Sequence, residues 1–280
     1  MTVSPQRSWK SFATVRENRD EMSNQPGART EELRDFAITI LLWICYILGY
    51  LVLFLPLCLW VALRCPDRKE ETFQRVNWQH HRLFFSLLRI LVPTVQWRVS
   101  EEVRALRSCV IVANHLSFLD PILFISLFEK QKTIVKSDYF RLPVYGWLLR
   151  GSGYIPSTAE GFFAVNMVDQ IKKMEAYLAA GGNLFIFPEG HRSRTGRIGP
   201  FDSGAFKIAR LCRAAPICVV RIRNTGKLFP PGKFLFNTRD AIVIEVELAG
   251  RIEPDYEGSA FSLSGLMDEA RALMEGKVVQ

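Results

Sequence analysis

Val110-Ile111-Val112-Ala113-Asn114-His115-Leu116-Ser117-Phe118-Leu119-Asp120 is the stretch that decides how this chain folds. Its first four residues form a short apolar run, which is typical of a strand buried on both faces of a sheet. Asp120-Pro121 then provides a good helix start, because a carboxylate caps the first turn and proline fits the first helical position. A strand followed directly by a helix favours an α/β fold. Such folds place their chemistry at the carboxyl ends of strands, where His115 and Asp120 lie.

Strand and helix patterns alternate from about residue 105 onward. Strands are expected over 108–113, 132–136, 153–157, 183–187, 215–222 and 241–248. Helices are expected over 120–129, 141–149, 161–180, 203–213 and 262–275. This order predicts an α/β fold with a mixed, largely parallel sheet flanked by helices.

The N-terminal part of the chain contains a long apolar segment. Phe36–Leu63 has no charged residue over 28 positions, which exceeds the ~20 residues that cross a hydrocarbon core. Gly49 and Pro56 leave two alternatives open, a tilted and kinked span or a hairpin that returns to the same leaflet. We therefore divide the chain into a polar tail (1–35), a transmembrane or re-entrant segment (36–63), an amphipathic interfacial region (64–95) and a catalytic domain (96–280).

Residues 73–92 predict an amphipathic helix. Apolar residues recur at helical spacing, whereas Arg75, Arg82 and Arg89 recur every seven residues on the other side. This helix could lie on anionic lipid, or it could pack on the domain with a solvated basic face. Within 20 residues, Lys and Arg number four before the apolar segment and five after it. The slight excess favours a cytoplasmic catalytic portion, as in a bacterial inner membrane or its equivalent.

Composition narrows the possible partners. The net charge is +8 and the pI is about 9.3, which indicates an anionic partner such as a phospholipid surface or a phosphorylated ligand. Nucleic acid is not expected, because no zinc knuckle or aromatic RNA-binding signature accompanies the basic residues. The six cysteines show no C-x-x-C spacing. They indicate buried thiols in a reducing compartment and no metal site.

His115 and Asp120 are candidates for general-base chemistry. A carboxylate that orients an imidazole makes a base able to take a proton from a hydroxyl. The alternative is that Asp120 serves only as a helix cap, although the two roles are compatible. Ser117 is a weaker candidate for a nucleophile, because no G-x-S-x-G elbow surrounds it.

A second motif, Phe187-Pro188-Glu189-Gly190-His191-Arg192-Ser193, follows another apolar strand. Proline and glycine fix a turn there, and the Arg192 guanidinium suits bidentate recognition of phosphate. Glu189 could bind the acceptor or hold Arg192; the alternative is a turn with a surface ion pair. Residues 192–233 carry ten basic side chains and one acid, Asp202, so we expect an anion-binding field there.

Together, N-H-x-x-x-x-D and F-P-E-G-x-R-S resemble the glycerolipid acyltransferases of the lysophosphatidic acid acyltransferase (PlsC-like) type, over roughly residues 85–250. The resemblance implies an α/β sandwich, resembling glycerolphosphate acyltransferases, on a membrane through an N-terminal helix. It implies His115 as base, Asp120 as its partner, and Glu189 with Arg192 in acceptor binding. The donor would be acyl-CoA or acyl carrier protein, a co-substrate with no further cofactor, and the acceptor a lysolipid. Asn114, Lys136, Gly190 and Ser193 complete the expected substrate-binding set.

One departure concerns the acceptor. Gly151-Ser152-Gly153-Tyr154-Ile155-Pro156-Ser157 matches the intermediate motif of these acyltransferases, but Ser157 stands where they have an arginine that binds phosphate. Lys136 or Arg150 could replace that contact. Lysophosphatidate is therefore the expected acceptor, with another lysophospholipid or a lyso-aminolipid such as lyso-ornithine lipid as alternatives. A non-catalytic lipid-binding module and a lipid hydrolase are the other hypotheses.

Overall fold

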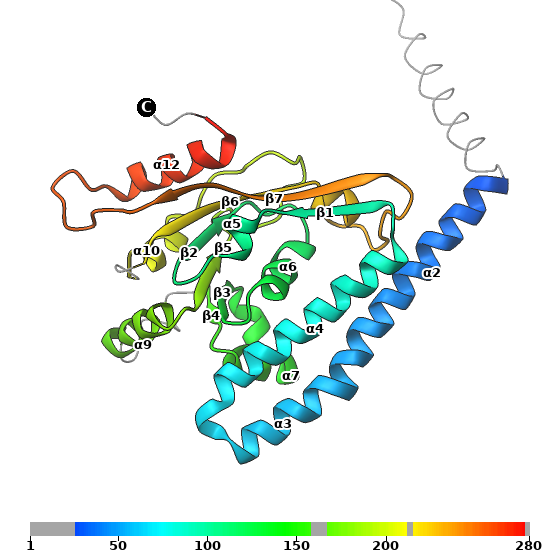
Figure 1. Ribbon diagram of the computed structural model, residues 1–280, viewed down its shortest axis with the longest axis horizontal. Coiled ribbons are helices and arrows are strands. Elements are labelled where there is room, and N and C mark those ends of the chain that lie inside the picture. The colour runs from blue at the N-terminus through cyan, green and yellow to red at the C-terminus, as the bar shows by residue number, and fades with distance from the viewer. Residues whose placement is uncertain (1–25, 158–166, 212–214, 278–280) are drawn as a thin grey trace, which may run out of the picture.

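The computed structural model describes residues 26–157, 167–211 and 215–277. Within them, a seven-stranded sheet has the strand order β1-β7-β6-β2-β5-β3-β4 (Figure 1). The strands are β1 (Val95–Val99), β2 (Val110–Ala113), β3 (Gln131–Val135), β4 (Ile155–Pro156), β5 (Asn183–Ile186), β6 (Ile217–Arg223) and β7 (Ile242–Ile252). Neighbours from β6 to β4 are parallel, whereas β7 is antiparallel to β6 and parallel to β1. The predicted mixed, largely parallel sheet is confirmed.

The six expected strands all form, and β1 is an addition that the sequence analysis missed. Its five residues alternate between apolar side chains that are buried or half-buried and polar side chains that are exposed, as expected of an edge strand. The expected strand 153–157 shrinks to the two residues of β4. β7 runs longer than expected, through a register shift opposite Val219 and Val220.

Helices cover both faces of the sheet (Figure 1). β2 separates two cores, because Ile111 and Ala113 face one cluster of buried side chains and Val110 and Val112 face the other. The first core packs against α4 (Lys69–Leu91) and α6 (Leu119–Leu127), and the second against α9 (Met167–Ala179), α10 (Ser203–Leu211) and α12 (Leu263–Glu275). Side chains that alternate between two covered faces explain the continuous apolar run of β2.

Shorter helical elements lie in the connections: η2 (Pro66–Arg68), α5 (Glu101–Arg104), η3 (Ser137–Arg141), α7 (Pro143–Gly151) and α11 (Thr225–Leu228). The expected helix over 161–180 is present as α9, but its first residues, 161–166, lie outside the described residues. Residues 212 and 213 of the expected helix 203–213 also lie outside them.

The N-terminal apolar segment forms a helical hairpin with α4. α2 (Pro26–Gly49), a π-helical turn η1 (Tyr50–Phe54) and α3 (Leu55–Arg64) run one way, and α4 returns beside them (Figure 1). The π turn explains why Pro56 does not break the helix. Proline lacks an N–H and its ring crowds the carbonyl four residues back. The wider turn, closed by the Leu55 N–H and the Tyr50 carbonyl, accommodates that loss.

Two boundaries expected in this region differ from the bounds of the helices. Residues 26–35, assigned to a polar tail, are part of α2, and residues 1–25 lie outside the described residues. Asp35 is buried and pairs with Arg239, with 2.6 Å between Oδ2 and Nε. The region 64–95 is not a separate interfacial segment either. Phe84, Phe85 and Leu88 of α4 are buried in the first core, which is the alternative in which this helix packs on the domain.

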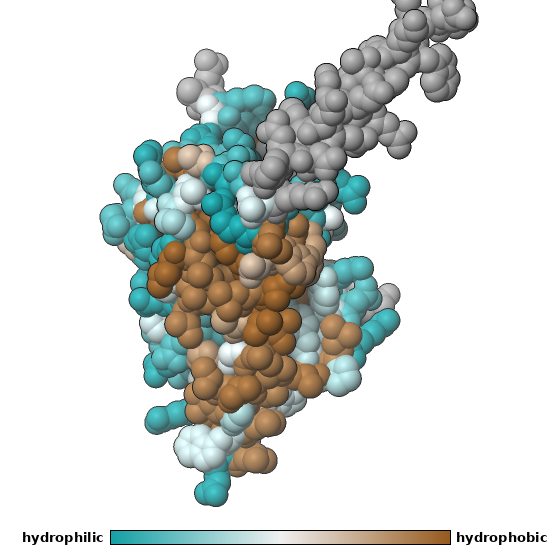
Figure 2. Space-filling model, turned by 90° about the vertical axis from the view of Figure 1, so that its right-hand side faces the viewer, coloured by the Kyte–Doolittle hydropathy of each residue, from teal (hydrophilic) through white to brown (hydrophobic). Residues whose placement is uncertain are grey.

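The outer side of the hairpin is apolar. Residues Thr30–Arg64 form one helix long and apolar enough to cross a membrane, and little of its most apolar stretch is buried. Figure 2 shows the result, a continuous hydrophobic surface along this side of the molecule. The inner side of α2 is held to the domain instead. Trp43 packs on Phe118 and Phe229, and the Thr39 hydroxyl accepts a hydrogen bond from the Phe236 N–H.

Candidate active site

His115 and Asp120 form a hydrogen-bonded pair at the carboxyl end of β2. His115 Nδ1 lies 2.9 Å from Asp120 Oδ2, and the histidine side chain is 17% exposed whereas the aspartate is fully buried. The same carboxylate oxygen accepts hydrogen bonds from the backbone N–H groups of Leu116 and Ser117, at 2.6 and 2.7 Å. The same oxygen of Asp120 therefore holds the backbone of residues 116 and 117 and orients the His115 ring.

This geometry fixes how the imidazole is used. Because a carboxylate oxygen only accepts, Nδ1 carries the proton, and in the neutral imidazole Nε2 is then the nitrogen with the lone pair. The Phe187 ring stacks on the imidazole, with 4.5 Å between centroids and 25° between the planes. The ring is therefore held by a hydrogen bond at its edge and by an aromatic face. The arrangement leaves Nε2 available as a general base.

Glu189 joins the two motifs through backbone groups. Its Oε1 accepts from the His115 N–H at 2.8 Å, and its Oε2 accepts from the Gly199 N–H at 2.7 Å. The side chain is 4% exposed. The two carboxylate oxygens thus fix the backbone at His115 and at Gly199, and this geometry gives Glu189 a positioning role. Its predicted contact with the acceptor stays a prediction.

The turn after β5 is closed by further backbone bonds. The Gly190 N–H donates to the Phe187 carbonyl, and the Ser193 N–H donates to the His115 carbonyl at 2.7 Å. Gly190 has φ +66°, a conformation that glycine adopts without strain. Among the described residues, Arg192 has no hydrogen-bond or ion-pair partner, and it is exposed. Arg192 is therefore the side chain of this motif that is available to an anion.

Asn114 is committed to the sheet. Its amide nitrogen donates to the Ile222 carbonyl at 2.9 Å and its amide oxygen accepts from the Ile222 N–H at 2.7 Å. This side chain therefore mimics a strand residue and ties the end of β2 to β6. Its predicted contact with substrate stays a prediction.

Lys136 and Ser157 lie at the same edge of the sheet as His115, at the ends of β3 and β4, two and three strands away from β2. Lys136 follows β3, is exposed, and forms an ion pair of 2.7 Å with Asp138, which raises the pKa of the lysine. The Ser157 N–H donates to the Val135 carbonyl, so Ser157 and Lys136 are near neighbours. Arg150, the other candidate to replace the missing arginine, donates to the Phe140 carbonyl at 2.6 Å.

The anion-binding field expected over 192–233 is weaker than the sequence suggested. Arg221 pairs with Glu247, and Arg223 pairs with both Glu245 and Glu247. These acids lie on β7, outside the counted segment, and the antiparallel pairing of β6 with β7 brings them opposite the arginines. Arg192, Arg194, Arg197 and Lys207, nearer the site, are exposed.

Several positions that support the site were not found from sequence. Gly199 supplies a donor to Glu189, and Phe187 supplies the stacking face. Ser117, considered above as a nucleophile, is fully buried and its hydroxyl donates to the Phe229 carbonyl at 2.8 Å. A buried hydroxyl committed to a carbonyl has no path to a substrate. Backbone donors and packing faces leave no pattern in the sequence that could have identified them.

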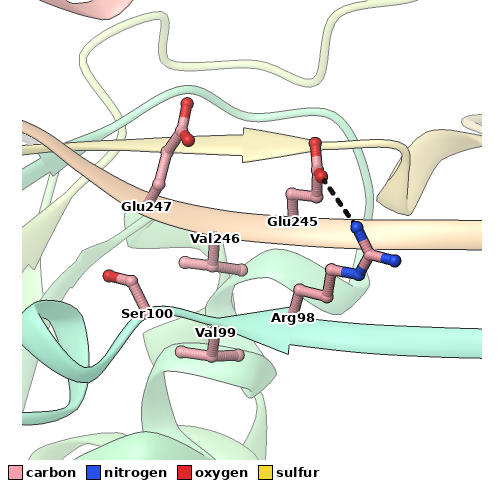
Figure 3. A pocket seen from close by; sticks show the side chains of 6 residues that line it. All are labelled: Arg98, Val99, Ser100, Glu245, Val246 and Glu247. Atoms are coloured by element: carbon pink, nitrogen blue, oxygen red, sulfur yellow. Dashed lines mark ion pairs between the residues drawn. The ribbon is translucent and has the colours of Figure 1, made fainter.

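A shallow hollow elsewhere on the sheet has no part in this site. Arg98, Val99, Ser100, Glu245, Val246 and Glu247 line it, on β1 and β7 (Figure 3). None of the predicted site residues is among them. Arg98 and Glu245 form an ion pair of 3.9 Å across it.

The His115–Asp120 pair lies in a part of the chain that is similar to known acyltransferases. Residues 94–223 match the family model described as Acyltransferase. A chloroplastic 1-acyl-sn-glycerol-3-phosphate acyltransferase from Brassica napus is 37% identical over 164 residues, which is 58% of this chain and 44% of that protein. One from Saccharomyces cerevisiae is 28% identical over 174 residues, covering 61% of this chain and 56% of that protein.

The crystal structure of PlsC, the 1-acyl-sn-glycerophosphate acyltransferase from Thermotoga maritima, has the same fold. It superposes with a TM-score of 0.64 at 19% identity, over 87% of this chain and 95% of that one. The chain thus carries an acyltransferase domain and is similar to 1-acyl-sn-glycerol-3-phosphate acyltransferases, with the fold of PlsC. It spans less than half the length of the plant relatives it matches.

Proposed function

We propose that this protein is a membrane-bound O-acyltransferase that moves a fatty acyl group from acyl-CoA or acyl carrier protein to the free hydroxyl of 1-acylglycerol-3-phosphate, giving phosphatidic acid. The observation that carries the proposal is the His115–Asp120 pair, with Nδ1 bonded to the carboxylate at 2.9 Å and Nε2 left as a base. The names of the relatives from Brassica napus and Saccharomyces cerevisiae support the acceptor.

The reaction needs no covalent enzyme intermediate. His115 Nε2 takes the proton of the acceptor hydroxyl as its oxygen attacks the thioester carbonyl carbon, forming the C–O bond. Collapse of the tetrahedral oxyanion breaks the C–S bond, and the imidazolium returns the proton to the thiolate that leaves. Asp120 stabilises the imidazolium between these two transfers.

Arg192 and Lys136 are the side chains best suited to the acceptor phosphate. Both are exposed at the edge of the sheet that carries His115, and Arg192 has no partner among the residues described. A guanidinium binds phosphate with two hydrogen bonds, whereas an ammonium acts as a point charge. Ser157 favours a second candidate, because a site without the usual arginine also suits a lysophospholipid with another head group or a lyso-aminolipid.

The helical hairpin supports attachment to one leaflet of a membrane. A helix that crosses a bilayer is surrounded by lipid or by other helices, but one side of α2 is held by polar contacts of Asp35 and Thr39 with the domain. Its other side exposes large apolar residues. This arrangement favours attachment to one leaflet over a single span, with α4 as the returning helix and no turn at Gly49 or Pro56. We place the domain on the cytoplasmic side, where acyl donors are available.

An acceptor panel tests the proposal. The full chain is assayed in mixed micelles with acyl-CoA and, separately, acyl carrier protein, against lysophosphatidate, other lysophospholipids and lyso-ornithine lipid, with products identified by mass spectrometry. Acylation of lysophosphatidate is expected, and its loss by about 10²- to 10⁴-fold in His115→Ala supports the mechanism. Activity confined to a phosphate-free acceptor would overturn the acceptor assignment. Lipid binding without any transfer would favour a non-catalytic module, and release of free fatty acid a hydrolase.

A further inference from the structure

Exposed apolar side chains are also found away from the hairpin. Tyr139, Leu142, Val144 and Tyr145, on η3 and the start of α7, are each 48–49% exposed. Among the described residues, the other large apolar side chains of comparable exposure lie on α2–α3 and α4, apart from Phe234. A local group of half-exposed aromatic and aliphatic residues marks an interaction site rather than ordinary surface. We call these four residues the η3–α7 surface.

The η3–α7 surface lies beside the hairpin. Leu148 of α7 is buried in one cluster with Cys58 of α3 and with Phe73 and Val76 of α4. The inner side of α7 therefore packs on the hairpin. The apolar residues at its start are left uncovered.

Charge around the η3–α7 surface favours an anionic partner. Residues 136–150 contain three cations, Lys136, Arg141 and Arg150, and one acid, Asp138. All three cations are exposed. Tyrosines with aliphatic residues and flanking basic residues suit the interface of a bilayer, where an aromatic ring can bury its body and keep its hydroxyl wet.

The location of the η3–α7 surface relates it to the candidate active site. η3 begins directly after β3, and β3 pairs in parallel with β5, which leads to Glu189. The carboxyl ends of β2, β3 and β5 meet at one edge of the sheet. η3, at the end of β3, therefore begins at the edge of the sheet that carries His115.

We propose that the η3–α7 surface is a second membrane-contact surface, which inserts into the interface of an anionic phospholipid bilayer and holds the His115 edge of the sheet against it. If the proposed function holds, this contact would let a lysolipid reach His115 from the leaflet, and only this consequence rests on the proposed function. The contact itself does not depend on the reaction.

Site-directed fluorescence in the full chain tests the contact. Val144→Cys is labelled with the environment-sensitive dye NBD in a background with Cys45, Cys65 and Cys212 changed to serine. The matched control carries the label at Asp268→Cys on α12, which is exposed at the opposite side of the molecule. Vesicles contain equal parts of phosphatidylglycerol and phosphatidylcholine, with or without spin-labelled lipid as a quencher.

The expected result is a blue-shifted, roughly threefold brighter emission at position 144 on vesicles, with quenching by the spin-labelled lipid, as for a side chain that leaves water for the interface. The control label should not change. Equal behaviour of the two labels on vesicles would overturn the proposal. A response at position 144 to an acidic acyl carrier protein without vesicles would also overturn it, in favour of a protein partner.

A second measurement uses the double variant Leu142→Ser/Val144→Ser. Turnover of a long-chain acceptor in vesicles should fall roughly fivefold, since the apolar surface that seats the domain is lost. Turnover of a short-chain acceptor in solution should stay unchanged, which also shows that the variant is folded. Equal loss with both acceptors would count against the proposal. An inactive parent chain whose label at position 144 still enters the bilayer would refute the proposed function alone.

Discussion

Glu189 accepts a hydrogen bond from the backbone N–H of His115 at 2.8 Å, so the acid of the second motif holds the proposed base of the first. The two residues are 74 positions apart in the chain. Because the other carboxylate oxygen holds Gly199, Glu189 fixes the loops on both sides of the histidine. A motif that resembles a binding site thus also supports the proposed base, His115.

Glu189→Gln should lower the catalytic rate without abolishing binding of the acceptor. A glutamine has one acceptor oxygen, so its amide nitrogen would face one of the two backbone N–H groups and leave that buried donor unpaired, at about 1–3 kcal/mol. We expect kcat to fall about tenfold or more at a nearly unchanged KM for the acceptor. Steady-state kinetics in micelles measures both.

The control for this variant is Arg192→Gln, which removes an exposed cation with no partner among the residues described. Its stability should match that of the parent chain, and the KM for a phosphate-bearing acceptor should rise about tenfold, the effect of losing a charge-assisted contact. A raised KM in Glu189→Gln with unchanged kcat would contradict the positioning role.

Asp120→Asn should be more severe. The carboxylate accepts from Nδ1 and from two backbone N–H groups at a single oxygen. An amide can keep that oxygen but does not stabilise the imidazolium, and it can turn its nitrogen toward the ring and select the other tautomer. By analogy with serine hydrolase triads, we expect kcat to fall about 10³- to 10⁴-fold. Circular dichroism should show an unchanged fold; a loss of less than tenfold would argue against His115 as the base.

Arg271 of α12 should act on the site through the loop that carries Gly199. Its guanidinium donates to the Ile198 carbonyl at 3.2 Å and pairs with Glu275 at 2.9 Å. Arg271→Ala frees this loop and weakens the bond to Glu189, so kcat should fall about three- to tenfold, as for one lost hydrogen bond to a charged group. Arg271→Lys should recover part of the loss.

Lys277→Ala is the matched control for Arg271. Lys277 also pairs with Glu275, at 2.5 Å, but no contact links it to Ile198. Its kinetics should equal those of the parent chain. Equal losses in both variants would show that the effect comes from α12 as a whole and not from the bond to the loop.

His80 and His81 should make the hairpin sensitive to acid. Burial lowers the pKa of His80 to about 3, with a contribution from His81, and burial lowers the pKa of His81 to about 4. Both values lie below the 6.5 of an unfolded histidine. The unfolded state therefore binds protons first, and stability present above pH 6.5 should be lost as the pH falls toward about 4. Thermal denaturation in micelles at pH 7.5 and 5 measures this loss.

His80→Phe separates the two histidines. Both ring nitrogens of His80 are buried without a partner among the described residues, between the rings of Tyr46, Tyr50 and Phe54. A phenyl ring fits the same surroundings without unpaired polar atoms, so the variant should be about 1 kcal/mol more stable at neutral pH. Its loss of stability in acid should be smaller. An unchanged pH dependence would show that His80 does not contribute to it.

The sequence by itself determined the α/β class, the six expected strands, the pairing of His115 with Asp120 and the resemblance to PlsC-like acyltransferases. These features depend on local patterns: apolar runs, a helix start at Asp120-Pro121, and motif residues at short spacing. The edge strand β1 was missed because its half-exposed alternation directly follows a helix and covers only five residues.

Only the tertiary structure decided how those residues are used. It assigned Glu189 and Asn114 to backbone donors and acceptors far away in the chain, placed Glu245 and Glu247 opposite the basic residues of β6, and packed α4 back along the continuous apolar helix. Each of these outcomes depends on which segments become neighbours in space. A partner that is a backbone group or a charge on a distant strand leaves no local pattern in the sequence. Strand order and packing therefore determine which partner each side chain meets.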